Sequence, residues 1–259
     1  MRNLAAWIGA ACVLTLGGCG QQEATGDEPA VSTGAAEDEV AAPELSAEEA
    51  SALAFRAAWE AAAPVTASDP RASDEDDNRW PEPVEGSFEF REGQVVQLAT
   101  NQYALISSGY VEGGGHSTAG ALAIHYLRRD GDGFRRIEID PMFIAGGSGG
   151  QAPTFEVRQD LTPSPAVVVS SGMTNQGETC VVGSVVELTP SHPVLRAIEM
   201  PLAHEASDGE DNWTGELAAG RRGRDFAIQY SGASDARTSW ILTDIGLYRA
   251  ASEPRLPGC

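Results

Sequence analysis

The chain has 259 residues, including 29 glycines and 15 prolines, and 42% of its residues are hydrophobic. Its 38 acidic residues outnumber the 17 basic ones, all of which are arginine, so the formal net charge is −21. This acidic excess argues against binding nucleic acid or an anionic membrane through a basic face. The glycine and proline content argues against a mostly helical protein, and the length allows one or two domains with a real core.

The first 18 residues have the pattern of a secretory signal peptide. Arg2 provides the positive charge, and the apolar run from Leu4 to Leu16 is shorter than the roughly 20 residues that a membrane-spanning helix needs. The run ends in Leu16-Gly17-Gly18-Cys19. This motif resembles the lipobox of bacterial lipoproteins, and the resemblance covers residues 1–19 only.

The lipobox resemblance implies how the protein is anchored. In that class of lipoproteins Cys19 carries fatty acids such as palmitate, the preceding peptide is removed, and the acyl chains hold the protein on a membrane. The residue after the cysteine is Gly20, not aspartate, which implies the outer membrane facing the periplasm over the inner membrane. The alternative is an ordinary cleaved signal peptide with an incidental cysteine.

After the lipidated cysteine, residues 19–79 have the composition of a tether. Residues 20–79 contain 15 acidic residues and three arginines, and they are rich in Ala, Ser, Pro and Gly. Such a segment buries too little apolar surface to offset its ordering entropy, so we expect most of it to be disordered. A solvated tether would let the folded part stand off the membrane.

One helix is predicted within the tether, at about residues 46–63. Ser46 and Glu49 fit a capping box, and an alanine-rich segment follows as far as Pro64. Phe55 and Trp59 lie four positions apart and therefore share a helix face. This face either packs on the protein's own domain or meets a partner or a membrane.

Residues 80–259 are predicted to form an all-β globular domain of antiparallel strands. Apolar residues alternate in the strand period between Gly, Asp and Pro turns. A segment of apolar residues closed by a small polar residue and Gly occurs three times, with a period of about 60 residues. The three matching segments are Ala104–Gly109, Val167–Gly172 and Ala227–Gly232.

The period suggests about three stacked modules in a propeller-like, sandwich or barrel arrangement. The third module lacks its last strand, so we expect the early strand Phe88–Arg91 to fill the gap by pairing with the C-terminal strand. The similarity could instead reflect only a generic strand-turn-strand pattern. In an oxidising periplasm, the two remaining cysteines, Cys180 and Cys259, are predicted to form a disulfide.

The loops after the three matching segments are the candidate binding site. If the modules stack, these loops gather on one rim, and loops on a rigid scaffold often carry binding residues. The rim would present polar side chains to a small polar ligand or to a partner protein of the envelope. Its candidate residues are His116, Thr118, Asn175, Glu178, Asp235 and Arg237.

No catalytic constellation, cofactor motif or metal-ligand pattern is recognisable, so a non-enzymatic binding or interaction module is the first interpretation. Ser148 lies in a Gly-rich segment that matches the nucleophile-elbow pattern, but no helix is expected after it. The first alternative is an envelope hydrolase with a site at the His116 loop. The second is a structural lipoprotein that acts through the Phe55/Trp59 helix.

Overall fold

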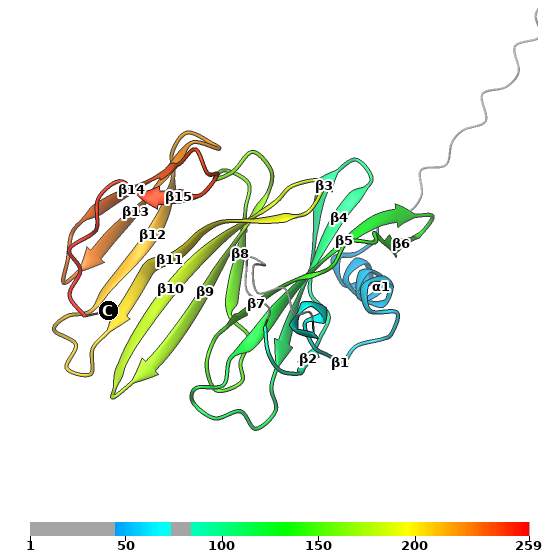
Figure 1. Cartoon of the computed structure of the whole chain (residues 1–259), viewed down its shortest axis with the longest axis horizontal. Coiled ribbons are helices and arrows are strands. Elements are labelled where there is room, and N and C mark those ends of the chain that lie inside the picture. The colour runs from blue at the N-terminus through cyan, green and yellow to red at the C-terminus, as the bar shows by residue number, and fades with distance from the viewer. Residues whose placement is uncertain (1–44, 74–83, 259) are drawn as a thin grey trace, which may run out of the picture. The chain divides into compact units, whose positions relative to one another are not determined.

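The structure is a computed structural model, and it describes residues 45–73 and 84–258. This part of the chain contains two antiparallel β-sheets, the helix α1 (Ala47–Trp59) and a short 3-10 helix, Pro70–Ser73 (Figure 1). The first sheet consists of β1 (Val65–Ala67), β2 (Phe88–Phe90), β3 (Gln94–Ala99), β4 (Gln102–Tyr110), β5 (Gly120–Asp130), β6 (Gly133–Arg136) and β7 (Met142–Gly146). The second consists of β8 (Thr154–Arg158), β9 (Ala166–Asn175), β10 (Glu178–Leu188), β11 (Pro193–Glu205), β12 (Trp213–Ala219), β13 (Asp225–Gly232), β14 (Arg237–Leu242) and β15 (Tyr248–Ala250).

Strand pairing follows chain order in most of the molecule. The second sheet has the order β15-β14-β13-β12-β11-β10-β9-β8, so every pair of neighbours is a hairpin. The first sheet has the order β1-β2-β4-β5-β6, with β3 paired to β4 and β7 paired to β5. The predicted all-β, antiparallel fold class is therefore confirmed.

Helix α1 begins where the capping box placed it. The backbone N–H of Glu49 donates to the Ser46 hydroxyl, and the Glu49 carboxylate accepts from the Ser46 backbone N–H. The helix ends at Trp59, four residues before the predicted end at 63, because Glu60 adopts a left-handed conformation with φ 54°.

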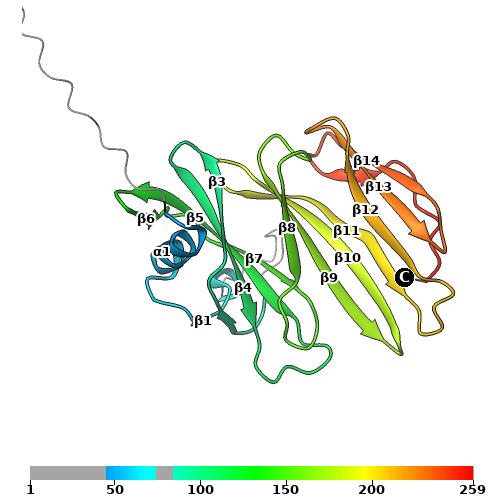
Figure 2. The same cartoon turned by 180° about the vertical axis from the view of Figure 1, so that it is seen from behind.

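The apolar face of α1 packs on the first sheet, on the side turned away from the second sheet (Figures 1 and 2). Phe55 is fully buried, and the Trp59 ring stacks on Phe90 with 4.6 Å between the ring centroids. Strand β1 extends the same sheet by pairing with β2. The prediction that residues 20–79 are mostly disordered is therefore wrong for 45–73, which are ordered because they pack on the β domain. The boundary placed at residue 80 lies inside the folded unit, and residues 20–44 and 74–79 lie outside the described residues.

The two sheets pack against each other through an inter-sheet core. Its residues include Ile106 and Ile124 of the first sheet, and Val167 and Leu188 of the second. The Tyr126 hydroxyl donates to the backbone carbonyl of Thr189 at 2.8 Å, which joins the sheets at one end of this core.

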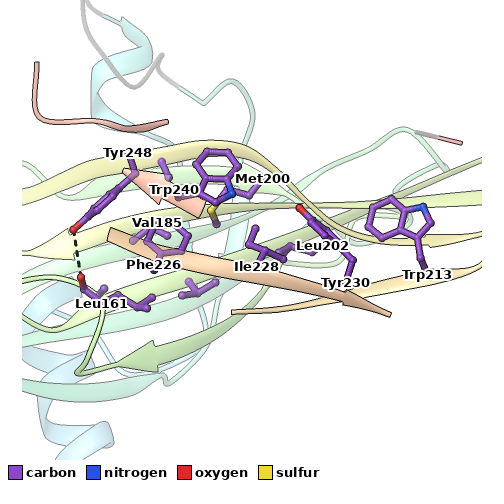
Figure 3. Packing of buried hydrophobic residues seen from close by; sticks show 13 residues of the cluster. Leu161, Val185, Met200, Leu202, Trp213, Phe226, Ile228, Tyr230, Trp240 and Tyr248 are labelled. Carbon is purple, nitrogen blue, oxygen red and sulfur yellow. Dashed lines mark hydrogen bonds between the residues drawn. The ribbon is translucent and has the colours of Figure 1, made fainter. Parts of the chain in front are cut away.

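A second core lies on the opposite face of the second sheet (Figure 3). Along β9, Val167 and Val169 belong to the inter-sheet core, whereas Val168 belongs to this inner core, because successive side chains point to opposite faces. The sheet curls over the inner core until β15 contacts β11. Its largest side chains are aromatic: Trp213, Phe226, Tyr230, Trp240 and Tyr248.

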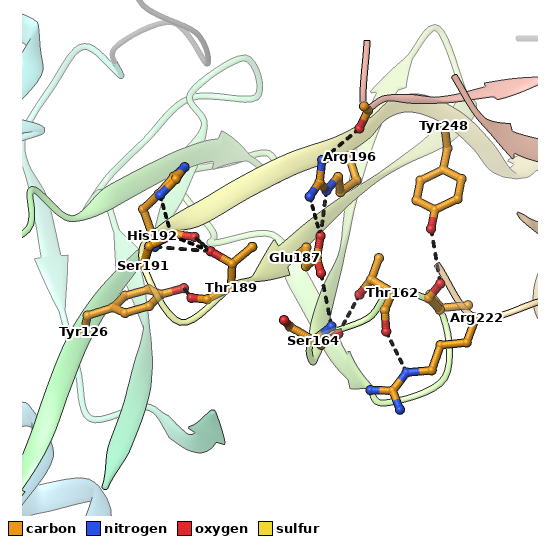
Figure 4. A network of polar contacts seen from close by, with 12 residues as sticks. Tyr126, Thr162, Ser164, Glu187, Thr189, Ser191, His192, Arg196, Arg222 and Tyr248 are labelled. Carbon is orange, nitrogen blue, oxygen red and sulfur yellow. Dashed lines mark hydrogen bonds and ion pairs between the residues drawn. The ribbon is translucent and has the colours of Figure 1, made fainter. Parts of the chain in front are cut away.

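A polar network ties the curled sheet together (Figure 4). The carboxylate of Glu187 on β10 is 3% exposed and accepts from Arg196 Nε on β11 at 2.7 Å. Its other oxygen accepts from the backbone N–H of Ser164 at 3.1 Å, and Arg196 Nη1 donates to the Gly246 carbonyl at 3.1 Å. One buried carboxylate thus connects β10, β11, the β8–β9 loop and the β14–β15 turn.

The three matching sequence segments form β4, β9 and β13, each of which is the first strand of a hairpin with the strand that follows it. A repeat of 60 residues stays a prediction. The expected pairing of Phe88–Arg91 with the C-terminal strand is wrong. β2 pairs with β1 and β4, whereas β15 pairs only with β14 in the other sheet. The reason is that Phe88 and Phe90 are buried in the core beneath α1.

Candidate functional site

The six predicted rim residues lie in three turns that the structure does not bring into one site. His116 and Thr118 belong to the β4–β5 loop of the first sheet, whereas the other four belong to two hairpins of the second sheet. Asn175 and Glu178 flank the β9–β10 turn. Strands β11 and β12 separate this hairpin from the one with Asp235 and Arg237, which places β10 and β13 about 14 Å apart across the sheet.

The His116 loop contacts the Gly-rich segment around Ser148. The Gly150 backbone N–H donates to the Thr118 carbonyl at 2.8 Å, and the Gly149 N–H donates to the His116 carbonyl at 3.4 Å. Gly150 has φ 75°, and a Cβ there would lie 2.2 Å from the Val111 carbonyl oxygen. Gly149 and Gly150 therefore allow the Gly-rich segment to lie close against the His116 loop. Strand β8 follows this segment, so it lacks the helix of a nucleophile elbow.

The His116 side chain has no triad geometry. Within residues 45–73 and 84–258, its imidazole makes no hydrogen bond to a serine hydroxyl or to a carboxylate. The same described ranges contain no group of three His, Cys, Asp or Glu side chains that could hold a metal ion. They also contain no helix with the length and apolar character needed to cross a membrane.

Glu178 belongs to a second arrangement, near the C-terminus. Its carboxylate lies 3.9 Å from Nε2 of the buried His204, which is the strand partner of Cys180. Trp213 Nε1 donates to the Pro257 carbonyl at 2.8 Å, and Gly258 lies so close to the His204 ring that a Cβ has no room. The last described residues thus lie against β11, beside the strand that carries Cys180.

Cys259 lies outside the described residues, so the Cys180–Cys259 disulfide stays a prediction that the placement of Gly258 supports. We expect a protease digest of the non-reduced protein to contain a peptide pair joined through Cys180 and Cys259. Adding reductant should separate the pair in the mass spectrum. Alkylation of both thiols without prior reduction would contradict the disulfide.

A candidate binding site is a groove of about 820 Å³ between the two sheets. One wall is β7 with the β4–β5 loop, a second is residues 84–88, and the floor is the face of β9, β10 and β11. Most of the exposed lining is apolar. Val182, in the floor, is 41% exposed, and it contributes apolar surface to the groove. We call this feature the inter-sheet groove.

A β-bulge shapes the floor of the inter-sheet groove. Gly183 is opposite Met200 and Val185 is opposite Ala197, so Ser184 alone faces the two residues Ile198 and Glu199. Glu199 has φ 53°, a left-handed conformation that costs a non-glycine residue about 1 kcal/mol or more. Such strain persists only where the surrounding structure imposes it, and here it places Ile198, Glu199 and Ser184 in the groove lining.

The charges of the inter-sheet groove have a single sign. Its two ionisable lining side chains are Glu85 and Glu199, and both are exposed. Neither forms an ion pair within the described ranges. A second groove, beside α1 and β6, mixes both signs: its charged residues are Arg56, Arg128, Arg135, Arg136, Glu60, Glu138 and Asp140.

Of the predicted rim residues, only Thr118 lines the inter-sheet groove. The remaining lining comes from segments spread over more than 100 positions of the chain, with no shared motif. The Val181–Gly183 region contains a glycine inside an apolar strand pattern, which is the one local signal of a bulge that the sequence offers. No family model, curated protein or solved structure matches the chain.

Proposed function

We propose that the protein is a lipid-anchored protein of the bacterial cell envelope, held by Cys19 and facing the periplasm, and that its β-rich unit is a non-enzymatic binding module. The lipobox residues support the anchor. The observation that carries the binding function is the inter-sheet groove, which combines an exposed apolar floor with two unpaired carboxylates. Binding sites are generally concave, mostly apolar and equipped with a few polar groups.

The two alternative functions have less support. For the hydrolase, the His116 imidazole has no serine or carboxylate partner in the described ranges. For the structural lipoprotein acting through its helix, Phe55 is fully buried against the first sheet and Trp59 packs on Phe90 and His125. That helix face is therefore already occupied by the protein's own domain.

The anchor predicts acylation at a single cysteine. Cells that express the protein and are fed an alkyne analogue of palmitate should yield labelled wild-type protein, because the lipid is attached to Cys19. The Cys19→Ser variant should be unlabelled. The matched control is Cys12→Ser, which changes the other cysteine of the signal segment and should keep the label. Equal labelling of the Cys19 variant would contradict the anchor.

The binding function predicts contacts in the groove of the full, lipidated protein. A photo-crosslinking amino acid placed at Val182 should give a discrete adduct in living cells, because this side chain is exposed in the groove floor. The control position is Ile245, which is 71% exposed and lies in the β14–β15 turn, outside the groove. Adducts that are absent at position 182, or identical at both positions, would sink the proposal.

A further inference from the structure

Strand β7, which forms one wall of the inter-sheet groove, pairs on one edge with β5 and has no strand partner on its other edge among the described residues. In an antiparallel sheet, alternate residues direct their N–H and C=O groups to the same neighbour. The Tyr126 carbonyl accepts from Ile137 N–H, so the even-numbered residues of β5 bond toward β6 and β7. Because Ile144 is opposite Leu122, Ile144 bonds to β5, and Phe143 and Ala145 direct their backbone groups away from it.

One contact agrees with this assignment. The Phe143 carbonyl accepts from the Arg71 guanidinium at 3.3 Å, which lies on the side away from β5. By contrast, no strand within residues 45–73 and 84–258 pairs with β7 on the side to which the backbone groups of Ala145 point. Ala145 is also exposed. An open donor and an open acceptor therefore lie together on the outer edge of β7.

This open edge borders the groove. Phe143, Ile144 and Ala145 all line it, although consecutive side chains of a strand point to opposite faces. Contact with three consecutive residues of a strand is expected where a groove runs along the edge of the strand. A chain lying in the groove would thus meet the backbone of β7 on one side.

The floor of the groove suits an extended chain. A peptide strand beside β7 presents alternate side chains to the floor, where Val182, Leu195 and Ile198 provide apolar surface. The floor also presents the hydroxyls of Ser171 and Ser184. The five residues of β7 correspond to about 17 Å, which matches a peptide segment of about five residues.

The charge of the groove selects the peptide. Within residues 45–73 and 84–258, Glu85 and Glu199 form no ion pair and no basic side chain lines the groove. A peptide with arginine or lysine side chains would place opposite charges beside both carboxylates, whereas an acidic peptide would add like charges. Complementarity of this kind decides specificity and association rate more than total affinity.

We propose that the inter-sheet groove binds an extended, basic and apolar segment of a partner polypeptide, which adds as a strand to the edge of β7. This inference rests on the proposed binding function and names its ligand class. Backbone hydrogen bonds to Ala145 provide affinity, the apolar floor takes alternate side chains, and Glu85 and Glu199 select basic residues.

The test uses the full lipidated protein purified in detergent and two fluorescent hexapeptides, one of alternating arginine and valine, the other of alternating glutamate and valine. Fluorescence anisotropy should show binding of the basic peptide, with at least tenfold weaker binding of the acidic one. The double variant Glu85→Gln/Glu199→Gln should reduce this preference at least threefold. An unchanged preference in the double variant would overturn the assigned role of the carboxylates.

Strand addition is tested by removing single backbone donors. Ala145→Pro deletes the outward N–H, and the bonds of β7 to β5 come from its neighbours, so the basic peptide should bind at least tenfold more weakly. If the proline variant misfolds, N-methylation of the peptide replaces it: methyl groups on one alternating set of amides should abolish binding, and those on the other set should not.

Equal effects of both methylation patterns, or equal binding by Ala145→Pro, would overturn strand addition. Failure of both peptides to bind would overturn the ligand class. In that case the crosslink at position 182 decides the fate of the binding function separately. A discrete adduct there would support the binding function with a different class of ligand. The absence of an adduct would contradict both the binding function and the peptide ligand.

Discussion

Lowering the pH from 7.5 to 4.5 should reduce the free energy of unfolding by about 3 kcal/mol through His125 alone. His125 is 2% exposed, and its ring lies 4.4 Å from the ring of Trp59 on α1, measured between centroids. Burial, with a smaller contribution from the Arg136 charge, lowers the pKa of His125 from 6.5 to about 3. Urea unfolding at a series of pH values measures the effect.

The direction follows from which state binds the proton. Below pH 6.5 the unfolded chain protonates this imidazole, while the folded protein keeps it neutral down to about pH 3. The contribution of His125 to the free energy of unfolding is therefore complete above pH 6.5. It decreases as the pH falls from 6.5 to 3. The control is His125→Gln, which has no titration at this position and should lack this part of the pH dependence. The same pH dependence in both proteins would show that folded His125 binds a proton.

Replacing Glu187 with alanine should destabilise the protein by about 3 kcal/mol, because it leaves a buried network without its acceptor. Arg196, which is 25% exposed, would lose its carboxylate, and the Ser164 backbone N–H would lose its bond at 3.1 Å. The measurement is urea unfolding at pH 7.5, followed by tryptophan fluorescence and circular dichroism.

A double variant separates the network from the charge. Glu187→Met/Arg196→Met removes both members and fills the site with apolar atoms, so it should be less destabilised than Glu187→Ala. A surface control is Glu89→Ala, because its pair with Arg91 is exposed and should contribute less than about 1 kcal/mol. A loss of stability in Glu187→Ala no larger than that of the surface control would contradict the role assigned to the network.

The sequence predicts the local features of this fold well. The capping box of Ser46 and Glu49 marks the start of α1, and the Asp-Gly sequence at residues 130–133, which is typical of a tight turn, joins β5 and β6. The end of α1 is missed because alanine-rich sequence continues to Ala63, and the left-handed Glu60 that stops the helix has no sequence signature. The disorder predicted for residues 45–73 fails because acidic composition does not show what an apolar face packs against.

Non-local features are harder to predict. Alternation identifies Phe88–Phe90 as a strand but not its partner, and the pairing with β4 depends on the aromatic cluster beneath α1. For the same reason, the sequence does not show that the three predicted rim loops belong to two different sheets. The inter-sheet groove cannot be predicted from the sequence, because the bulge in its floor depends on how β10 pairs with β11.

Residues 166–169 of β9 and 185–188 of β10 are buried on both faces of the sheet, which has a consequence for how the two strands align. In a sheet with one solvent-exposed face, a register shift of one residue exposes apolar side chains to water and is therefore unfavourable. Here Val167, Val168 and Val169 would each exchange one dry environment for another, so hydrophobicity alone distinguishes the two alignments weakly. A slip of β10 would, however, move the charge of Glu187 among the aliphatic side chains around Leu188. The carboxylate of Glu187 thus determines the alignment of β9 with β10, which the valines alone do not determine.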